Sequence, residues 1–426
     1  MTTLAEIVRR YGPAYQAQYG EQLLPSQQAA LTAIEACRTA ALGGQVFTCT
    51  DCGTVRYSYH SCRNRHCPLC GQGDAQRWLE QQHELLLPLP YFLITFTLPS
   101  ELREVAYRHQ RQLYALFFRA SASALQQLAA DPRFVGGQLG MLGVLQTWTR
   151  DLRYHPHIHY LVPAIGLAAD GRFCRPRNPA FLVPVQALAV LFRAKLRAAL
   201  RQTGYSGGIP AAVWTQPWVV DCRPVGSGAA ALKYLAPYIF RVALSNNRIV
   251  RLADDRVTFR YVDGATHQPK TCTLPALAFI HRFVQHVLPR GFVKVRFYGL
   301  FSRRYRPLLA QLRAQLALKV AAEPPSVAPS RPGLPGLLPA PALDRCPQCG
   351  QVMQARPLAP LRSRGPPAAL HTRHRQVGLY SACWAHRKMH AWLALPLQQG
   401  GGAPQALEPS PTCGSIGAAT AGARRW

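Results

Sequence analysis

The chain has 426 residues, with 49 Lys or Arg against 19 Asp or Glu, which gives a formal net charge of +30. This length suggests two or three domains with room for a large core. The charge is spread along the chain, which favours a groove that follows a polyanion over a disordered basic arm. Nucleic acid is the first candidate partner, and an anionic membrane surface or a merely basic soluble surface comes second.

The sequence carries no segment typical of secretion or of membrane insertion. Its first six residues lack the apolar stretch of a signal peptide. The most apolar run, residues 85–99, contains three prolines and is too short to span a bilayer. We therefore expect a cytoplasmic protein with no membrane partner and with reduced thiols. Clustered cysteines in that setting bind metal more often than they form disulfides.

Two C-x-x-C-G knuckles predict a structural zinc site near the start of the chain. Cys49 and Cys52 form the first knuckle, Cys67 and Cys70 form the second, and 14 residues separate them. Four thiolates can surround one Zn²⁺ tetrahedrally, and the glycine after each pair allows the tight turn. Because cysteine fills all four positions, the site is closed and its role is structural. Residues 1–88 are thus expected to form a helix plus zinc-binding module.

Four further residues of this module stay unassigned, namely Cys37, His60, Cys62 and His66. They either build a second zinc site or are packing residues beside a phosphate-facing patch. The second interpretation is favoured, because no C-x-x-C pair anchors another site. Arg63 and Arg65 lie among these residues, and we expect both to contact DNA.

Residues 89–320 have the pattern of an α+β domain, in which an antiparallel sheet is flanked by helices. Apolar and β-branched runs predict the strands, and amphipathic runs predict the helices. The strands are expected at residues 91–98, 139–149, 157–164 and 214–221. The helices are expected at residues 99–130, 186–202 and 274–288.

One of these strands carries a candidate metal site. His157 and His159 point to the same face of a strand, where two imidazoles can bind one ion. Gln146, on the antiparallel neighbour, is either a third ligand or simply a polar strand residue. His155 has the same parity and competes for that place, although Pro156 is a residue type that interrupts strands.

A later helical stretch carries two tyrosines four residues apart. Tyr234 and Tyr238 therefore share one helix face, and taken alone they are typical of ordinary core or surface tyrosines. Beside a metal ion, a tyrosine oxygen can attack a phosphodiester, because the ion stabilises the charge that builds on phosphorus. Lys233 and Arg241 flank the pair and could neutralise phosphate. Such an exchange of phosphodiesters needs no nucleotide cofactor, and the sequence has no G-x-x-x-x-G-K loop.

Together these motifs resemble a known family. The run from His155 to His159, the Tyr234-x-x-x-Tyr238 pair and the segment at residues 241–249 are similar to the two-tyrosine HUH transposases of bacterial insertion sequences, the rolling-circle enzymes of the IS-ninety-one type. The cysteine block resembles the zinc-binding region of that family, and residues 283–299 resemble its closing segment.

The resemblance implies a fold, a chemistry and a set of roles. It implies an HUH endonuclease fold like that of replication proteins and relaxases, preceded by a small zinc-ribbon-like module. His157 and His159 would bind Mg²⁺ or Mn²⁺, and Tyr234 and Tyr238 would be paired nucleophiles. The enzyme would nick single-stranded DNA at element ends through 5′-phosphotyrosine intermediates, in the nucleoid of a bacterium. The wider HUH class often has a histidine in place of Gln146, although a glutamine oxygen still suits a hard cation.

The remaining segments give weaker indications. Residues 249–261 predict a basic hairpin after Arg248, which either contacts DNA or is plain structure. Residues 321–426 are expected to be a Pro-rich linker and a mostly disordered tail with a lone C-x-x-C pair, Cys346 and Cys349. A further zinc site there is the less favoured interpretation.

Two other functions remain open at this level. A plasmid replication initiator or relaxase would share the histidine and tyrosine chemistry. A catalytically inactive zinc-containing DNA-binding protein would share the charge and the cysteines. The zinc block before the HUH motif favours the transposase.

Overall fold

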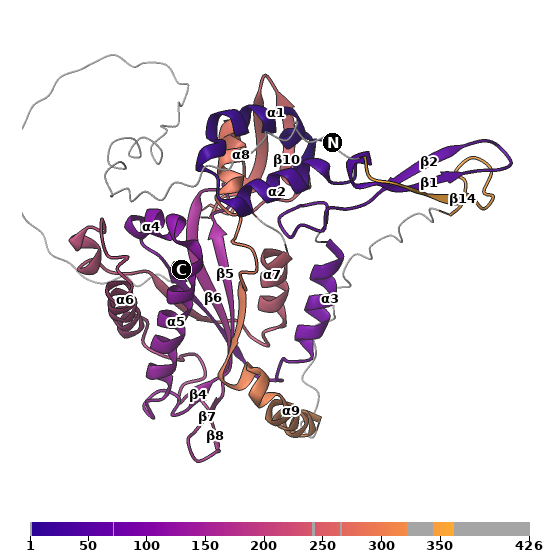
Figure 1. Cartoon of the computed structure of the whole chain (residues 1–426). Coiled ribbons are helices and arrows are strands. Elements are labelled where there is room, and N and C mark those ends of the chain that lie inside the picture. Colours follow the sequence, from indigo (N-terminus) through magenta and orange to yellow (C-terminus); the bar gives the residue numbers. More distant parts are fainter. Residues whose placement is uncertain (1, 71, 241–242, 265, 322–343, 362–426) are drawn as a thin grey trace, which may run out of the picture. The chain divides into compact units, whose positions relative to one another are not determined.

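A five-stranded antiparallel sheet with the strand order β13-β5-β6-β3-β9 forms the centre of the fold (Figure 1). Its strands are β3 (Tyr91–Thr97), β5 (Met141–Trp148), β6 (Tyr154–Pro163), β9 (Val220–Pro224) and β13 (Val295–Tyr298). The predicted antiparallel pair is confirmed, and its histidine strand, β6, lies in the middle of the sheet.

The computed structural model describes residues 2–361 apart from 71, 241–242, 265 and 322–343. These residues belong to one compact unit, Met1–Ser363. Among the helices described in it, none is both long and apolar enough to cross a lipid bilayer.

Helices cover both faces of the central sheet because its strands are apolar on both sides. Phe92, Ile94 and Phe96 of β3 pack into one cluster with α5 and α6. Leu93 of β3 and Leu161 of β6 pack into another cluster with α3, α7 and α9. The bounds of these helices are α3 (Gln72–His83), α5 (Gln110–Ala129), α6 (Val185–Gln202), α7 (Ala229–Phe240) and α9 (Arg306–Ala321).

Two sequence predictions within this domain need correction. The single helix expected at 99–130 is split into α4 (Arg103–Arg108) and α5, because His109 between them has a non-helical backbone. Pro156 does not end β6. It falls where the register between β5 and β6 shifts, and at such an irregularity a residue without an N–H costs no ladder bond.

The strand expected at residues 214–221 lies further along the chain. Residues Ala211–Trp214 form a 3-10 turn, and the strand, β9, begins only at Val220. The intervening Trp218 is buried in the core and its indole N–H donates to the carbonyl of Val213, so this segment folds back on itself before it joins the sheet.

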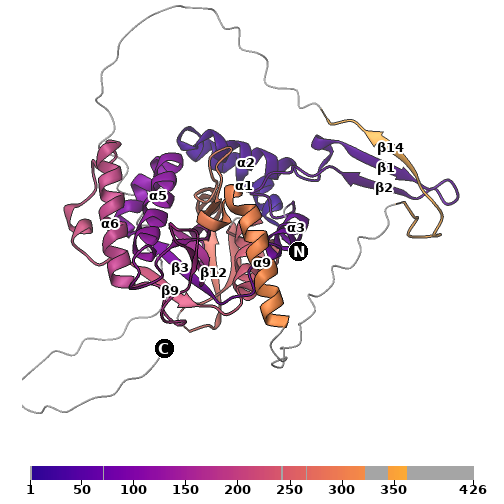
Figure 2. The ribbon, with the colours of Figure 1, turned by 90° about the horizontal axis from the view of Figure 1, so that it is seen from below.

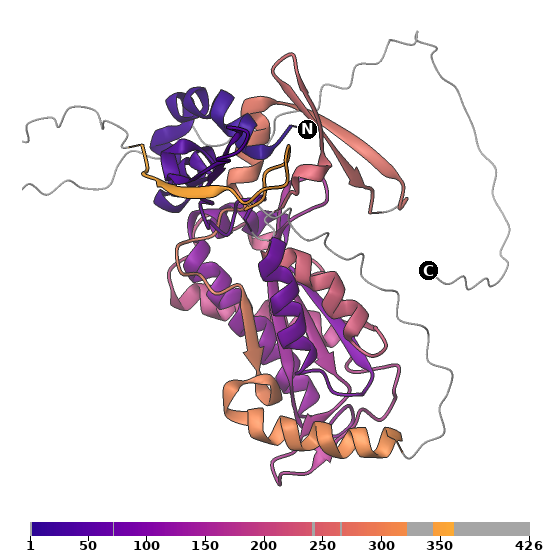
Figure 3. The same ribbon diagram turned by 90° about the vertical axis from the view of Figure 1, so that its right-hand side faces the viewer.

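The amino-terminal helices pack on a second sheet from later in the chain (Figures 1 and 3). Thr3 and Glu6 form a capping box at the start of α1, and the backbone N–H of Leu4 donates to the side-chain oxygen of Asn246. The core of this region therefore crosses the expected boundary at residue 88. Its elements are α1 (Leu4–Tyr19), α2 (Pro25–Ala36), α8 (Ala276–Val284), β10 (Ile249–Ala253), β11 (Arg256–Val262) and β12 (Pro269–Pro275). The predicted hairpin at 249–261 is confirmed as β10 and β11.

A third sheet joins the two ends of the described chain. The hairpin of β1 (Gly44–Thr48) and β2 (Val55–Tyr59) is completed by β14 (Gln354–Leu358), which pairs antiparallel with β1 (Figure 2). The segment at 344–361 therefore belongs to the amino-terminal module, which corrects its expected place in a tail. The linker at 322–343 and the tail at 362–426 lie outside the described residues.

A small sheet of β4 (Gln138–Leu139), β7 (Gly166–Leu167) and β8 (Phe173–Cys174) borders the central one.

Candidate functional site

The two histidines share one face of β6 and lie next to each other. Their ring centroids are 4.9 Å apart, and His157 and His159 are 9% and 8% exposed. In the strand register, His159 lies opposite Thr95 of β3 and His157 lies opposite Gln146 of β5, so these side chains project from the same face. Leu161 continues that face into the cluster under α7.

Hydrogen bonds fix the orientation of both rings. His157 donates from Nδ1 to the carbonyl of His155 over 2.7 Å, which makes Nε2 the nitrogen that carries the lone pair. The Nδ1 of His159 forms a hydrogen bond of 2.9 Å with the hydroxyl of Thr95. Anchoring one ring nitrogen in this way is typical of histidines that bind a metal through the other.

Burial keeps both imidazoles neutral at neutral pH. Desolvation, with a smaller contribution from His159, holds the pKa of His157 well below its ordinary value of 6.5. Desolvation, with a smaller contribution from the charge of Arg223, lowers the pKa of His159 to about 4. A neutral imidazole is the form that binds a metal ion, so the pair is in the ligating state without a proton to displace.

Gln146 offers an acceptor beside this pair. Its amide nitrogen donates to the carbonyl of Trp148 over 3.2 Å, which assigns its oxygen to the opposite side. That oxygen, Oε1, is buried and has no hydrogen-bond partner among the described residues. A buried carbonyl oxygen without a donor is costly, and coordination of a cation would satisfy it. The donor set of two imidazoles and an amide oxygen therefore fits a divalent cation.

His155 is engaged differently. Its Nδ1 accepts a hydrogen bond of 2.7 Å from the guanidinium of Arg103. Burial and, next, the charge of Arg103 lower its pKa to about 4. Among the described residues, His155 does not join His157 and His159 in a group with three ligand atoms within metal-binding distance. These contacts favour Gln146 over His155 as the third ligand.

The tyrosine helix covers the histidine face. Leu232 and Leu235 of α7 are buried against Leu93, Leu161 and Val144, and Val144 lies opposite His159 in the strand register. Tyr234 and Tyr238 lie four residues apart on this helix, but their side chains and Arg241 lie outside the described residues. Lys233, on the same helix, is exposed.

The expected zinc set is wrong in its pairing. Eight of the described cysteines form two separate groups, and within each group the sulfur atoms lie within 4.8 Å of one another. The groups are Cys37, Cys62, Cys67 and Cys70, and Cys49, Cys52, Cys346 and Cys349.

The hairpin geometry explains this division. Cys49 and Cys52 lie at the tip of the β1–β2 hairpin, and Cys37 and Cys62 lie beyond its base. A strand of five residues is about 17 Å long, far more than one ion can bridge. Each group is therefore completed by other cysteines. Cys37 and Cys62, which were expected to be packing residues, complete the group at the base, and the pair predicted to be alone, Cys346 and Cys349, completes the group at the tip.

The predicted DNA-binding arginines have different surroundings. Arg65 donates to the carbonyls of Phe292 and Pro289 over 2.7 and 3.0 Å, which ties the cysteine loop to the segment before β13. Arg248 donates to the carbonyls of Ala243, Arg260 and Arg150, which holds the start of β10 in place. Both guanidinium groups thus support structure, although Arg65 is exposed, as is Arg63.

Two residues near the histidines were missed in the sequence. Asp221 of β9 lies opposite Thr95 on the far side of β3, and Arg223 follows it on the same strand face. Arg223 is exposed, forms a 3.7 Å ion pair with Asp221, and is close enough to His159 to lower its pKa. The predicted strand at 214–221 ended at Asp221 and left Arg223 outside, whereas the observed pairing of Asp221 with Thr95 puts both residues on the histidine face.

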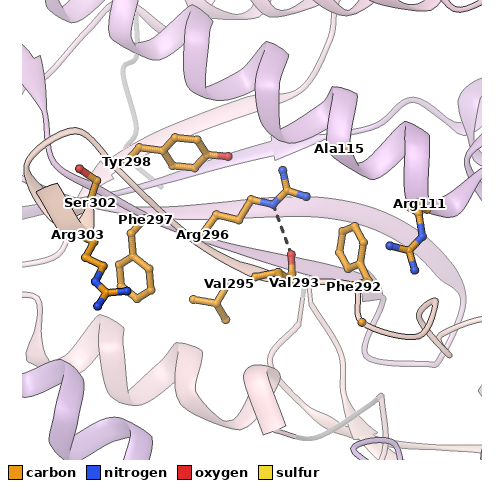
Figure 4. A pocket seen from close by; sticks show the side chains of 11 residues that line it. Arg111, Ala115, Phe292, Val293, Val295, Arg296, Phe297, Tyr298, Ser302 and Arg303 are labelled. Atoms are coloured by element: carbon orange, nitrogen blue, oxygen red, sulfur yellow. Dashed lines mark hydrogen bonds between the residues drawn. The ribbon is translucent and has the colours of Figure 1, made fainter.

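A hollow with a volume of about 680 Å³ follows the edge strand β13 (Figure 4). Its lining includes Arg111, Arg296 and Arg303, and Arg296 lies 4.4 Å from the ring centre of Phe118. None of the proposed metal ligands is among the lining residues. The hollow is therefore a basic groove along the edge strand, apart from the proposed metal ligands.

Comparison with known proteins places these features in a family. A family model described as "Putative transposase" matches residues 140–307, and one described as "Transposase zinc-binding domain" matches residues 7–98. The chain is 39% identical to the "Putative transposase y4qJ" of Sinorhizobium fredii (strain NBRC 101917 / NGR234) over 375 residues, which are 82% of this chain and 93% of that protein. It is 28% identical over 293 residues to the transposase for insertion sequence element IS801 of Pseudomonas savastanoi pv. phaseolicola, covering 64% of this chain and 70% of that protein.

Among solved structures, the conjugative relaxase TrwC in complex with oriT DNA is similar over 26% of this chain and 43% of that chain. The TM-score is 0.23 and the sequence identity 19%.

Proposed function

Because the chain belongs to the two-tyrosine transposases of the IS-ninety-one type, with an amino-terminal zinc-binding domain, we propose that it nicks single-stranded DNA at the ends of an insertion sequence and transfers the strand. The observation that carries this proposal is the histidine face. Two neutral, oriented imidazoles, and an amide oxygen without a partner among the described residues, share a sheet face with the leucines on which the tyrosine helix packs. Such a constellation suits phosphoryl transfer.

In this proposal His157, His159 and Gln146 hold Mg²⁺ or Mn²⁺. When bound, the cation would polarise a phosphate oxygen and offset the charge that develops on it during cleavage. The protein itself supplies the rest of the environment. Thr95 keeps the ring of His159 turned to the site, and Arg223, exposed beside it, can attract the phosphate of an incoming strand.

The covalent step uses one of the two tyrosines of α7. The phenolic oxygen of Tyr234 or Tyr238 forms a bond to phosphorus, and the bond from phosphorus to the 3′-oxygen of the preceding nucleotide breaks. The phenolic proton is released and the 3′-oxygen leaves as a hydroxyl, so one phosphodiester replaces another. The second tyrosine, one helical turn away, can cut a second strand while the first still holds its own. Lys233 neutralises backbone phosphate nearby.

The tyrosines are tested with oligonucleotides that carry the element's own terminal sequences. We expect the intact chain with Mn²⁺ to form a covalent adduct that survives denaturing electrophoresis, and the double variant Tyr234→Phe with Tyr238→Phe to form none. If the double variant attaches DNA as well as the intact chain does, the nucleophiles are elsewhere. If the intact chain attaches none of its terminal sequences, a DNA-binding protein without catalysis is the better account.

The metal ligands are tested by titration with Mn²⁺ alone, which needs no DNA. We expect Gln146→Met to weaken binding by about tenfold or more, and Gln146→Glu, which keeps an oxygen in place, to preserve it. His155→Ala is the matched control, since its backbone carbonyl still accepts from His157. Equal losses in Gln146→Met and His155→Ala would contradict this ligand set.

A further inference from the structure

Two knuckles from opposite ends of the described chain have the same backbone geometry. In each, the N–H of the first cysteine donates to the carbonyl five residues later, and the N–H of the glycine donates to the carbonyl of that cysteine, all over 2.8–3.1 Å. Both glycines have a left-handed backbone, with φ of +72° and +74°. The residues are Cys49, Gly53 and Thr54 in one knuckle and Cys346, Gly350 and Gln351 in the other. Two such turns face to face are the frame of a zinc ribbon.

The sulfur atoms of these knuckles are spaced for a metal ion. Cys49 and Cys349 are 3.5 Å apart, Cys52 and Cys346 are 3.4 Å apart, and Cys52 and Cys349 are 3.6 Å apart. Zinc–sulfur bonds of about 2.3 Å in a tetrahedron put sulfur atoms about 3.8 Å apart. A disulfide would need about 2.05 Å, and all four cysteines are free thiols in the structure.

The packing around the knuckles is too small to hold them by itself. The buried cluster at this point consists of Phe47, Cys49, Cys346 and Met353. Two of its four members are the cysteines, so little apolar surface remains to stabilise a three-stranded sheet. Polar contacts add a hydrogen bond of 2.7 Å from Thr54 to Gln348 and the pairing of β14 with β1. A sheet of this kind is usually completed by a metal.

We propose that Cys49, Cys52, Cys346 and Cys349 bind a Zn²⁺ ion that is separate from the one at Cys37, Cys62, Cys67 and Cys70. The described part of the chain then carries two structural zinc ions. The site combines two ligands from the amino-terminal hairpin with two from the segment at 344–361. Cys346 and Cys349 lie outside both regions that match family models, residues 7–98 and 140–307. Its ion fastens the segment at 344–361 to the amino-terminal hairpin and closes the chain between Cys52 and Cys346 into a ring.

Metal content of the purified full chain tests the stoichiometry without any measure of activity. We expect two zinc ions per chain in the intact protein and one in Cys346→Ser with Cys349→Ser. The matched control, Cys174→Ser with Cys272→Ser, removes two described cysteines outside both groups and should keep two ions. One ion in the intact chain, or two in the Cys346 and Cys349 variant, would overturn the proposal.

A conservative variant separates loss of a ligand from loss of folding. Cys349 is exposed, so histidine fits there without disturbing the buried cluster. Because histidine also binds zinc, Cys349→His should keep two ions, whereas Cys349→Ser should lose one. Loss of the ion in both variants would mean that Cys349 is not a ligand.

The fastening role is tested with a specific protease site placed between residues 321 and 344 of the full chain. After cleavage, the carboxy-terminal fragment should elute together with the rest of the protein from a sizing column. It should separate in Cys346→Ser with Cys349→Ser, or after a zinc chelator is added. A fragment that stays attached without zinc would show that strand pairing alone holds it.

Discussion

The two glycines before α7 allow a direct test of how the tyrosine helix is seated. Gly226 and Gly228 both have a left-handed backbone, with φ of +65° and +77°. A Cβ at Gly226 would meet no atom within 4 Å, whereas a Cβ at Gly228 would lie 2.7 Å from two atoms of the Tyr91 ring. Tyr91 is fully buried and its hydroxyl accepts from the N–H of Leu87, so the ring cannot turn away. The two alanine variants therefore differ mainly in this clash.

The expected losses follow from these contacts. Alanine in a left-handed conformation costs about 1–2 kcal/mol, and this applies to both positions. At Gly228 the ring or the helix must also shift by about 1 Å to restore a normal carbon–carbon contact, which adds about 1–3 kcal/mol. We expect the free energy of unfolding to fall by about 1–2 kcal/mol in Gly226→Ala and about 2–5 kcal/mol in Gly228→Ala.

Urea unfolding measures the stabilities, and adduct formation with terminal oligonucleotides measures the function. Since α7 starts immediately after Gly228, a shift of its first turn displaces the tyrosines, and Gly228→Ala should lose far more adduct than Gly226→Ala. Equal effects of the two variants in both assays would refute the idea that contact with Tyr91 sets the position of the helix.

Three further predictions concern variants of charged or titratable residues. Burial lowers the pKa of His286 to about 4, below its unfolded value of 6.5, so this group favours folding above pH 6.5 and that contribution is lost as the pH falls towards 4. His286→Gln should therefore reduce the stability difference between pH 7.5 and pH 5 by about 2 kcal/mol, measured by urea unfolding at both pH values. Arg63→Ala should weaken DNA binding and lower the salt dependence by about one phosphate contact, because Arg63 is exposed. Arg65→Ala should instead lower stability with little change in the salt slope, since its guanidinium binds two carbonyls.

Local rules were enough to predict the histidine face. Strand parity alone put His157 and His159 together, and the pairing of two neighbouring apolar runs put Gln146 beside them. These contacts depend on the alternation of side chains between the two faces of a strand and on the short loop between β5 and β6. Both features are visible in the sequence. The hydrogen bonds of the rings are not visible there, because they depend on which carbonyl and which hydroxyl the folded backbone presents.

The cysteine pairing shows where local rules fail. Knuckles close in sequence are the natural partners, yet Cys49 and Cys52 join Cys346 and Cys349 from almost 300 residues away. The β1–β2 hairpin separates the pair Cys49 and Cys52 from the pair Cys67 and Cys70. Its length excludes a shared metal ion, but that length is known only once the strand register is known. The roles of Arg65 and Arg248 were equally hidden, since a guanidinium that binds carbonyls and one that binds phosphate look the same in a sequence.

The first cysteine group is joined to the sheet through hydrogen bonds. Arg65 and His66 lie inside its loop, and His66 accepts at Nε2 from the N–H of Leu288 over 3.1 Å. Arg65 and His66 bind the segment at residues 288–292, which leads into β13. Lys294 directly precedes β13, and its carbonyl accepts a hydrogen bond of 2.9 Å from the N–H of Leu145. Leu145 directly precedes Gln146. The zinc loop thus supports the strand that carries the third proposed ligand, in addition to any contact with DNA.

Loss of this group should therefore weaken the histidine site from a distance. In Cys62→Ser with Cys70→Ser, the loop that holds residues 288–292 loses its anchor, and β13 loses support against β5. We expect Mn²⁺ affinity to fall in that variant and to stay unchanged in Cys346→Ser with Cys349→Ser, whose group borders another sheet. Circular dichroism at the titration temperature verifies that both variants remain folded. Equal Mn²⁺ affinities in the two folded variants would mean that the loop and the site are independent, and that the zinc module acts on DNA alone.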